Sequence, residues 1–362
     1  MKIGIDGLAL TIPNPCGTKL YAEQLLKALA LIDKKNQYII FSKKEIQIPI
    51  QRNFSLTKIP TKIPILKRQF FLAYMAKKAN VDVFHFLEPV GALFNNGLKI
   101  VTTVHDLNLN YTYPFNKYLL KRLYCEFFRW FTLKNSNQII TDTNYISQEL
   151  EKYFTKCGWS KKIATIHLGC QNIFQTQSIS RKSFFLARGD HAPRKNVDRI
   201  IEAYSLLPEY VKNRYRLKVI ASTKSAKRNF LEFSRYFDVK ARVEVIDSVN
   251  EEELVRLYNR AICYVYPSLY EGFGLPILEA MACSCPVITS NYGAMKEVAG
   301  GAAYLVNPES TQQISKAMLE LHSNNGFRKV FINAGLKRKN FFSWNKTAME
   351  TLRTYREVYS EK

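Results

Sequence analysis

The chain alternates short apolar stretches with helical patterns, and it does so in two successive series. The strand-like stretches of the first series are KIGIDG (2–7), YIIFS (38–42), VDVFHF (81–86), KIVTTVHD (99–106) and NQIITDT (137–143). Those of the second series are SFFLARG (183–189), RLKVIAS (216–222), ARVEVID (241–247), CYVYPS (263–268), CPVITS (285–290) and AAYLV (302–306). Two βα series in a row predict two doubly wound parallel sheets, so the expected fold class is α/β.

The helix-poor stretch LGCQNIFQTQSISRK (168–182) separates the two series. At 362 residues the chain also exceeds what a single core usually supports. We predict an N-terminal Rossmann-like domain over residues 1–172 and a C-terminal one over 173–342, followed by a helix over 343–362 that packs back toward the N-terminal domain. Ligands of such sheets bind at the carboxyl ends of the strands, so the default site is a cleft between the two facing domains.

Composition narrows the class of protein. Hydrophobic residues make up 47% of the chain, but no uncharged apolar run approaches the eighteen or so residues that span a bilayer. The N-terminus MKIGIDGLAL lacks the features of a signal peptide, so we expect a cytoplasmic protein. The seven cysteines are dispersed and form no CxxC pair, which argues against a zinc site and a disulfide framework.

The formal net charge of +23 calls for an anionic partner, which would be nucleic acid, a membrane surface or a phosphorylated substrate. Between Lys43 and Lys78 there are nine Lys or Arg and one acidic residue, a local net charge of 9 − 1 = +8. Within that region, LKRQFFLAYMAKKA (66–79) places basic pairs on both sides of QFFLAYMA. This composition fits a helix lying on an anionic bilayer, and it fits equally a core-facing helix with solvated basic ends.

The stretch EGFGLPILE (271–279) is the most unusual local sequence. It follows the buried strand predicted over 263–268, and Pro276 suits the first turn of a helix. The unit therefore reads as strand, glycine loop and helix, with Glu271 before the helix and Glu279 inside it. A helix N-terminus behind a glycine loop favours phosphate. The alternative is that Glu271 lies in a surface turn and Glu279 faces solvent.

Further polar candidates also follow predicted strands. They are His105 and Asp106, Asp142, and the loop GDHAPRKN (189–196). In that loop, Lys195 beside Arg194 resembles a clamp for phosphate oxygens, because it combines a point charge with a planar fork. The chain contains no DxD, the usual carboxylate site for a divalent metal on a nucleotide-sugar. We therefore expect Lys, Arg and helix amides to neutralise a diphosphate, and we predict no metal site.

The segment from Tyr266 to Asn307, which includes PSLYEGFGLPILEAMACSCPVITSNYGAMKEVAGGAAYLVN, resembles the donor-binding signature of the retaining glycosyltransferases of family four. These enzymes have the two-domain GT-B fold. Seven residues lie between the two glutamates, as in the paired-glutamate motif of that family. Further agreement comes from CGTKLY (16–21), VTTVHDLNLNYTYP (101–114) and APRKN (192–196).

For the C-terminal domain, the resemblance implies a nucleotide-sugar site. Glu271 is then expected near the hydroxyls of the transferred sugar and the reacting centre, and Glu279 at the ribose hydroxyls of the nucleotide. Lys195, with Arg194 nearby, is expected to neutralise the leaving diphosphate. The expected backbone amide donors to the sugar and diphosphate are those of Gly272, Phe273, Gly274 and Leu275.

For the N-terminal, acceptor-side domain, the resemblance implies that His105 contacts the sugar and that Gly17 lets the first loop approach the phosphates closely. The sequence departs from the family in two places. Lys19 and Leu20 stand where many relatives have glycine and arginine, and Asp190 stands where many have an arginine. Both departures concern how the diphosphate is held.

The resemblance thus implies a retaining, metal-independent glycosyltransferase without a cofactor. The expected reaction moves a sugar, by association mannose, from a nucleotide-sugar donor to a saccharide or lipid-linked acceptor in polysaccharide or lipopolysaccharide assembly. The cytoplasmic face of an anionic membrane is a candidate location. Two alternatives stay open at this point. One is a GT-B enzyme of other chemistry, such as a nucleotide-sugar epimerase or a phosphorylase; the other is a basic nucleic-acid-binding protein, for which charge is the only support and no specific nucleic-acid motif is found.

Overall fold

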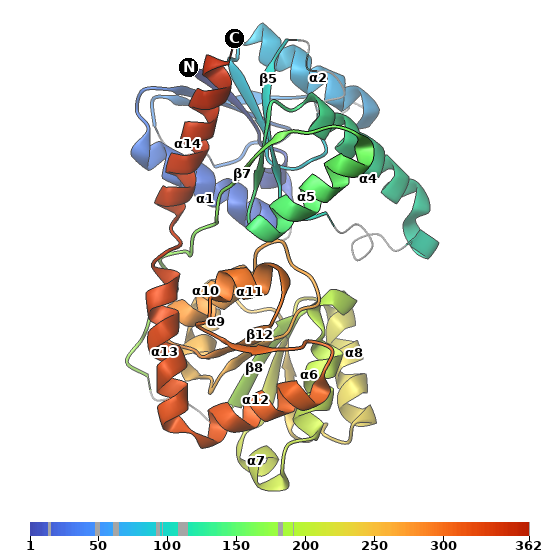
Figure 1. The fold of residues 1–362 in the computed structure, drawn as a ribbon, viewed down its shortest axis with the longest axis vertical. Helices are drawn as coiled ribbons and strands as arrows, with labels where there is room; N and C mark the ends of the chain where they lie inside the picture. The colour runs from blue at the N-terminus through green and yellow to red at the C-terminus, as the bar shows by residue number, and fades with distance from the viewer. Residues whose placement is uncertain are drawn as a thin grey trace. The chain divides into compact units, whose positions relative to one another are not determined.

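The computed structural model describes residues 1–13, 16–47, 51–60, 65–91, 95, 97–107, 115–179, 184–190 and 192–361, with the backbone alone at 65–70, 115–118 and 121. The chain divides into two compact units (Figure 1). One comprises Met1–Gly169 and Ser343–Lys362, and the other comprises Cys170–Phe342. The division after residue 169 lies three residues before the boundary predicted from the sequence, and the C-terminal segment from Ser343 belongs to the first unit.

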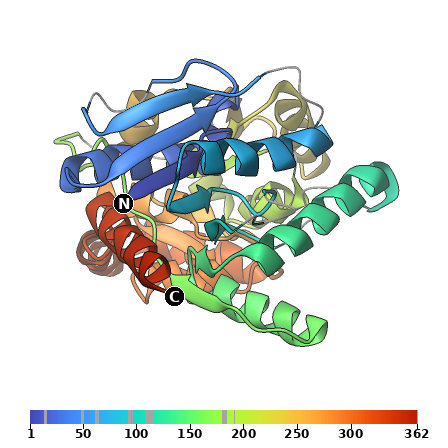
Figure 2. The same cartoon turned by 90° about the horizontal axis from the view of Figure 1, so that it is seen from above.

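The first unit holds a parallel sheet with the strand order β3-β2-β1-β4-β5-β6-β7. Its strands are β1 (Lys2–Asp6), β2 (Gln37–Ser42), β3 (Phe54–Lys58), β4 (Val83–Phe86), β5 (Lys99–Val104), β6 (Gln138–Thr141) and β7 (Lys162–Thr165). Its helices are η1 (Ala9–Thr11), α1 (Gly17–Ile32), α2 (Ile65–Lys78), α4 (Phe115–Asn135), α5 (Asn144–Cys157) and α14 (Trp344–Ser360). Figures 1 and 2 show α1 and α14 on one face of the sheet and α2, α4 and α5 on the other.

Helix α2 contains most of the stretch with basic pairs at both ends. Its described apolar side chains Leu72, Ala73 and Ala76 are buried in a core cluster that also contains Phe84 and Phe86 of β4. These side chains share one side of the helix, and that side packs against the sheet. The core-facing interpretation is therefore correct for this part of the segment. The side chains of residues 66–70, which include the first basic pair, lie outside the described residues.

The C-terminal helix α14 is fixed to the first unit by polar contacts. Thr347 Oγ1 donates to the His167 carbonyl at 2.7 Å, and the Tyr355 hydroxyl lies 2.6 Å from Nδ1 of the buried His85. A Cβ added to Gly169 would lie 2.2 Å from the Trp344 backbone nitrogen. Glycine is therefore needed where the chain leaving β7 passes the start of α14.

The second unit holds a parallel sheet with the strand order β10-β9-β8-β11-β12-β13. Its strands are β8 (Phe184–Gly189), β9 (Arg216–Ala221), β10 (Val243–Ile246), β11 (Tyr264–Tyr266), β12 (Val287–Ser290) and β13 (Tyr304–Val306). Its helices are η2 (Pro193–Lys195), α6 (Val197–Ser205), α7 (Glu209–Arg214), α8 (Lys224–Tyr236), α9 (Glu251–Arg260), α10 (Leu275–Ala282), α11 (Gly293–Ala299), α12 (Thr311–Ser323) and α13 (Asn325–Lys339). A core cluster of buried apolar residues joins β8, β9 and β11 to α6, α8 and α12.

Every strand predicted from an apolar stretch is present, and both sheets are parallel as predicted. The sequence analysis missed β3 and β7, which form the two edges of the first sheet. In the described part of the chain, no helix combines the length and the apolarity needed to cross a membrane.

Candidate functional site

The loop that carries Lys195 is held between the ends of two strands. Asn196 has a left-handed backbone with φ of 59°, and its side-chain amide donates to the carbonyls of Pro267 and Pro308 at 2.8 and 2.7 Å. A Cβ on Gly189, the last residue of β8, would lie 2.4 Å from a methyl carbon of Val197. The missing side chain at Gly189 therefore lets β8, the loop and α6 pack closely, which fixes Lys195 at the carboxyl end of the sheet.

Glu271, Arg194 and Lys195 form one charged cluster. Lys195 Nζ lies 2.7 Å from Glu271 Oε1, and Arg194 Nη1 lies 2.7 Å from Glu271 Oε2. The Tyr266 hydroxyl donates to Glu271 Oε1 at 2.8 Å and accepts from Lys195 Nζ at 2.9 Å. Ser268 Oγ lies 2.9 Å from the same carboxylate oxygen. Both oxygens of Glu271 are thus bound within the second unit.

The electrostatics of Glu271 follow from these contacts. Burial alone would raise the pKa of this carboxyl, but Lys195 and Arg194 outweigh it and lower the pKa to about 2. The Glu271 side chain is 12% exposed. The alternative in which Glu271 lies in a surface turn is therefore wrong, because its carboxylate is a largely buried anion between two cations.

Glu279 is buried in the middle of α10. Its Oε2 accepts a hydrogen bond from the Tyr258 hydroxyl at 3.3 Å. Burial raises the pKa of Glu279, although the positive charge of Arg188 opposes the shift. The alternative in which Glu279 faces solvent is also wrong. A buried carboxylate with an elevated pKa is costly for folding and is typical of a functional site.

The glycine loop between the two glutamates leads directly into α10. Gly274 caps the helix with φ of 104°, a backbone conformation that favours glycine, and Leu275 begins the helix ahead of Pro276. The first N–H groups of a helix have no acceptor within the helix. The predicted amide donors from Gly272 to Leu275 therefore lie on the segment between Glu271 and the first turn of α10.

His105 belongs to the first unit and follows β5. Its Nδ1 lies 2.7 Å from Asp142 Oδ2, and the Tyr21 ring packs edge-on against its imidazole at 4.6 Å between centroids. Within the described residues, His105 Nε2 has no hydrogen-bond partner. Burial lowers the pKa of His105, but Asp142 outweighs this effect, with smaller contributions from Glu88 and Asp106, so that the net shift is upward.

The N-terminal glycine loop is only partly described. Gly17 is the first residue of α1, and within the described residues a Cβ added there would have no neighbour within 4 Å. Packing in the described structure therefore does not require glycine at this position, and a close approach to phosphate stays a prediction. Lys19, one of the departures from the family, directs its ammonium to the Ile12 carbonyl at 3.0 Å.

Three residues of the C-terminal site were not singled out from the sequence. Tyr266 and Ser268 contact Glu271, and Arg188 at the end of β8 acts electrostatically on Glu279. Arg188 could have been found, because it is a charged residue in the apolar stretch SFFLARG. Asp190, the second departure from the family, accepts the Ala192 amide at 2.8 Å, so its carboxylate shapes the loop.

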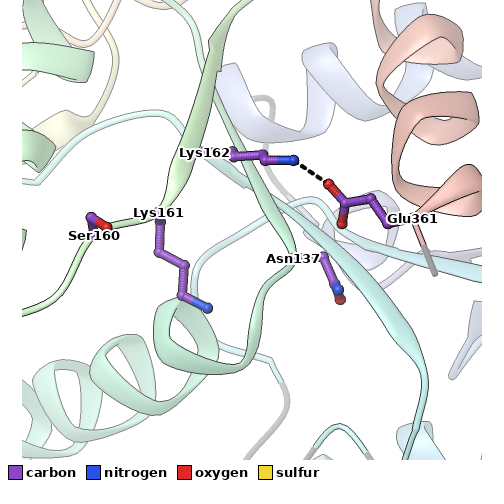
Figure 3. A pocket seen from close by; sticks show the side chains of 5 residues that line it. All are labelled: Asn137, Ser160, Lys161, Lys162 and Glu361. Atoms are coloured by element: carbon purple, nitrogen blue, oxygen red, sulfur yellow. Dashed lines mark hydrogen bonds and ion pairs between the residues drawn. The ribbon is translucent and has the colours of Figure 1, made fainter.

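A separate pocket in the first unit is lined by Asn137, Ser160, Lys161, Lys162 and Glu361 (Figure 3). Lys162 Nζ lies 2.5 Å from Glu361 Oε1, and Lys161 Nζ donates to the Ser136 carbonyl. Asn137 directly precedes β6, Lys161 directly precedes β7 and Lys162 is the first residue of β7, whereas Asp142 follows β6. The pocket is therefore at the amino ends of the strands, opposite to the edge that carries His105 and Asp142, where doubly wound sheets bind ligands.

The second unit presents two cations at the carboxyl edge of a parallel sheet, next to the start of a helix. Lys195 and Arg194 are suited to an anion with several oxygens, such as a diphosphate. Glu271 is ionised and can accept hydrogen bonds from hydroxyl groups. Among the described residues, no cluster of three or more His, Cys, Asp or Glu has an arrangement that could hold a metal ion.

Comparison with protein families accounts for both units. The model described as "Glycosyltransferase Family 4" matches residues 33–170, and the model described as "Glycosyl transferases group 1" matches residues 171–338. Together they cover every strand of both sheets except β1. The chain belongs to glycosyltransferase family four. The cluster around Glu271 thus lies in the part of this glycosyltransferase that matches the group 1 model.

Several known proteins are similar to this glycosyltransferase. The O-antigen chain mannosyltransferase B of Escherichia coli is 28% identical over 271 residues, which cover 71% of this chain and 70% of that protein. The serotype-specific mannosyltransferase WbdA of Escherichia coli is 31% identical over 46% of this chain, but that match spans 20% of WbdA. Sucrose-phosphate synthase from Thermosynechococcus elongatus has the same GT-B fold, with a TM-score of 0.79, 18% identity and 99% of each chain covered.

Proposed function

We propose that this glycosyltransferase moves a mannosyl residue, with retention of configuration, from a nucleotide-sugar to a saccharide or lipid-linked saccharide. The proposed setting is the assembly of O-antigen or another cell-surface polysaccharide. The choice of mannose and of this setting is supported by the similarity to O-antigen chain mannosyltransferase B. The proposed location is the cytoplasmic face of the membrane, where the enzyme is peripherally bound.

The cluster of Glu271, Arg194 and Lys195 is the observation that carries the proposal. It brings together two cations and one carboxylate from segments 76 residues apart in sequence. A diphosphate leaving group carries its negative charge on several oxygens. We propose that Arg194 and Lys195 pair with these oxygens in place of the Glu271 carboxylate. Glu271 is then left to accept hydrogen bonds from the hydroxyls of the transferred sugar. Preplaced charges of this kind are usually the largest single contribution to catalysis.

Retention follows if the diphosphate leaves and the acceptor hydroxyl attacks on the same face of an oxocarbenium-like centre. The charge of the ionised Glu271 favours positive charge developing nearby, and Arg194 and Lys195 favour negative charge on the leaving group. The proposed roles elsewhere are ribose binding for Glu279 and a sugar contact for His105. Such a mechanism needs charge stabilisation and no covalent nucleophile.

We further propose that transfer needs no divalent metal. The chain contains no DxD, and the two cations of the cluster can neutralise the diphosphate without one. Bidentate Arg contacts and Lys point charges are both established devices for binding phosphate oxygens.

The proposal is tested by titrating the protein calorimetrically with a panel of nucleotide-sugars that differ in base and in hexose. We expect one mannose nucleotide to bind with the highest affinity. Incubation with that donor and a saccharide acceptor should give a product whose anomeric configuration, measured by NMR, matches that of the donor. Inversion would contradict retention. Release of free sugar or of an epimer, without need of an acceptor, would favour the epimerase alternative.

A further inference from the structure

A continuous chain of buried hydrogen bonds, here called the α14 network, joins α14 to α1 inside the first unit. The Tyr355 hydroxyl lies 2.6 Å from His85 Nδ1, and His85 Nε2 lies 2.8 Å from Thr103 Oγ1. Thr103 Oγ1 in turn lies 3.0 Å from the Tyr21 hydroxyl. Each of these four side chains is 1% exposed or less. They come from α14, β4, β5 and α1, so the network joins four separate elements.

Tyr21, the last member of the α14 network, packs against His105. The two rings meet edge-on, with 4.6 Å between their centroids and 75° between their planes. His105 also has the hydrogen bond between its Nδ1 and Asp142 Oδ2 at 2.7 Å. One hydrogen bond does not fix the plane of an imidazole, because the χ2 torsion of histidine is broad. The Tyr21 ring supplies a second constraint, and the two together determine where His105 Nε2 points.

Helix α14 supports Tyr21 at two points. Trp344 is the first residue of the helix, and its ring centroid lies 6.3 Å from that of Tyr21. Tyr355, about three turns further along, begins the α14 network. Figures 1 and 2 show α14 and α1 on the same face of the sheet. The helix that follows the return of the chain from the second unit at Ser343 thus supports the ring against which His105 packs.

His85 transmits hydrogen bonding from one side of its ring to the other. Burial, with a smaller effect of His105, lowers the pKa of His85 to about 3, so its imidazole is neutral near pH 7. A neutral imidazole has one donor and one acceptor nitrogen. If Tyr355 donates to Nδ1, then Nε2 donates to Thr103, and the other tautomer reverses both bonds. Loss of the partner on one side therefore changes the preferred hydrogen bonding on the other side.

Packing alone does not require the polar groups of the α14 network. Phenylalanine and valine would fill nearly the same volumes as Tyr21, Tyr355 and Thr103 without burying a hydroxyl, which loses its hydration on folding. What a fully satisfied buried network adds is a single well-defined arrangement of the elements that contribute to it. In this unit, that arrangement includes the position of the Tyr21 ring beside His105.

We infer that the α14 network is a set of positioning residues through which α14 sets the orientation of the His105 imidazole. The inference rests on the proposed sugar contact of His105 for its role in transfer. The orientation itself belongs to the free enzyme, so it can be measured without donor or acceptor. A failure of the network and a failure of the sugar contact therefore give different results.

The first test is Tyr355→Phe, which removes the hydroxyl at the far end of the α14 network and keeps the ring. We expect the imidazole C–H signals of His105 to shift in the NMR spectrum of the free enzyme, with His105→Gln to assign them. The matched control is Tyr38→Phe. Tyr38 is equally buried in the same unit, and its hydroxyl donates to Asp33 at the same distance of 2.6 Å. The control should leave the His105 signals at their wild-type positions.

The second test uses Thr103→Val, which keeps the shape of the side chain and removes the oxygen that both His85 and Tyr21 contact. We expect kcat to fall by about tenfold to 10²-fold, the upper value being that of a misplacement of about 1 Å. The donor KM should change less, because the affected contact lies near the reacting centre. Thr103→Ser retains the hydroxyl and should restore most of the turnover, and Tyr38→Phe should turn over like the wild type.

Each variant must first show a native circular dichroism spectrum, and Tyr21→Phe takes the place of Thr103→Val if that variant does not. His105 signals that move no further in Tyr355→Phe than in Tyr38→Phe would overturn the inference. So would a loss of turnover in Thr103→Ser as large as that in Thr103→Val, because the hydroxyl would then be irrelevant. Shifted His105 signals together with wild-type kcat would support the network and contradict the proposed sugar contact.

Discussion

Lys195 Nζ and the Tyr266 hydroxyl both lie within 2.8 Å of the same oxygen of Glu271, and the two are 2.9 Å from one another. Arg194 pairs with the other oxygen of the Glu271 carboxylate. Both cations proposed to bind the diphosphate are therefore already paired with Glu271. If Arg194 and Lys195 bind the diphosphate as proposed, nucleotide binding replaces the Glu271 carboxylate at these cations by another anion.

The first prediction follows from this competition. Glu271→Gln should bind free nucleoside diphosphate more tightly than the wild type, by several-fold up to about tenfold, where tenfold corresponds to about 1.4 kcal/mol. Calorimetric titration measures the difference. Glu232→Gln, an exposed change on α8, should bind like the wild type. Weaker binding by Glu271→Gln would show that the carboxylate orders the two cations and does not compete with the ligand.

The second prediction concerns His105. Asp142→Asn should move the titration midpoint of the His105 imidazole to lower pH, because Asp142 outweighs burial and holds the pKa above its ordinary value. The raised pKa stabilises the fold below the unfolded value of about 6.5, and this contribution is lost as the pH rises through the folded value. The stability difference between wild type and variant should thus be largest at acidic pH.

NMR titration of the imidazole C–H signals checks this, with His105→Gln to assign the resonance among the five histidines. Glu88 and Asp106 also raise the pKa and remain in the variant, so the shift should be partial. An unchanged midpoint would mean that the His105 and Asp142 pair does not set the charge of this imidazole.

The third prediction is that transfer survives excess chelator, whereas Lys195→Ala loses turnover on the order of 10²-fold, as expected for a preplaced charge stabiliser. Initial rates with saturating donor provide the measurement. Lys224→Ala, at the exposed start of α8, is the control and should retain full activity. Loss of activity in chelator that manganese restores would contradict metal-independent transfer.

The fourth prediction separates the paired glutamates by role. Glu279→Gln should raise the donor KM and leave kcat closer to normal, because a ribose contact is equally strong in the ground state and the transition state. Steady-state kinetics across donor concentrations distinguish this from a loss of kcat. An unchanged KM would remove Glu279 from the donor site.

The sequence predicted every strand of the second sheet and five strands of the first, because short apolar stretches alternate with helical patterns. It missed β3 and β7, since FSLTK and KIAT are short edge strands with partly exposed residues and little apolar character. The role of α2 stayed open because composition alone does not show which side of a helix meets a sheet. The packing of Leu72 and Ala76 against the sheet shows which side of α2 faces the core, for the described side chains.

The sequence predicted the three charged residues of the cluster but not the contacts between them. Glu271, Arg194 and Lys195 each follow a strand in the sequence, yet no local pattern shows that they contact one another. The hydroxyl of Tyr266 was missed because an aromatic residue in a buried strand reads as core, although its ring is buried and its hydroxyl bridges Lys195 and Glu271.

The most direct test of the account is the turnover of Glu271→Gln with saturating nucleotide-sugar and acceptor, after circular dichroism has shown a native spectrum. The amide keeps the shape of the side chain but removes the negative charge close to the proposed reacting centre. We predict that kcat falls on the order of 10²-fold or more, as for the loss of other preplaced electrostatic groups. Turnover equal to that of the wild type would show that the Glu271 cluster is not where transfer occurs.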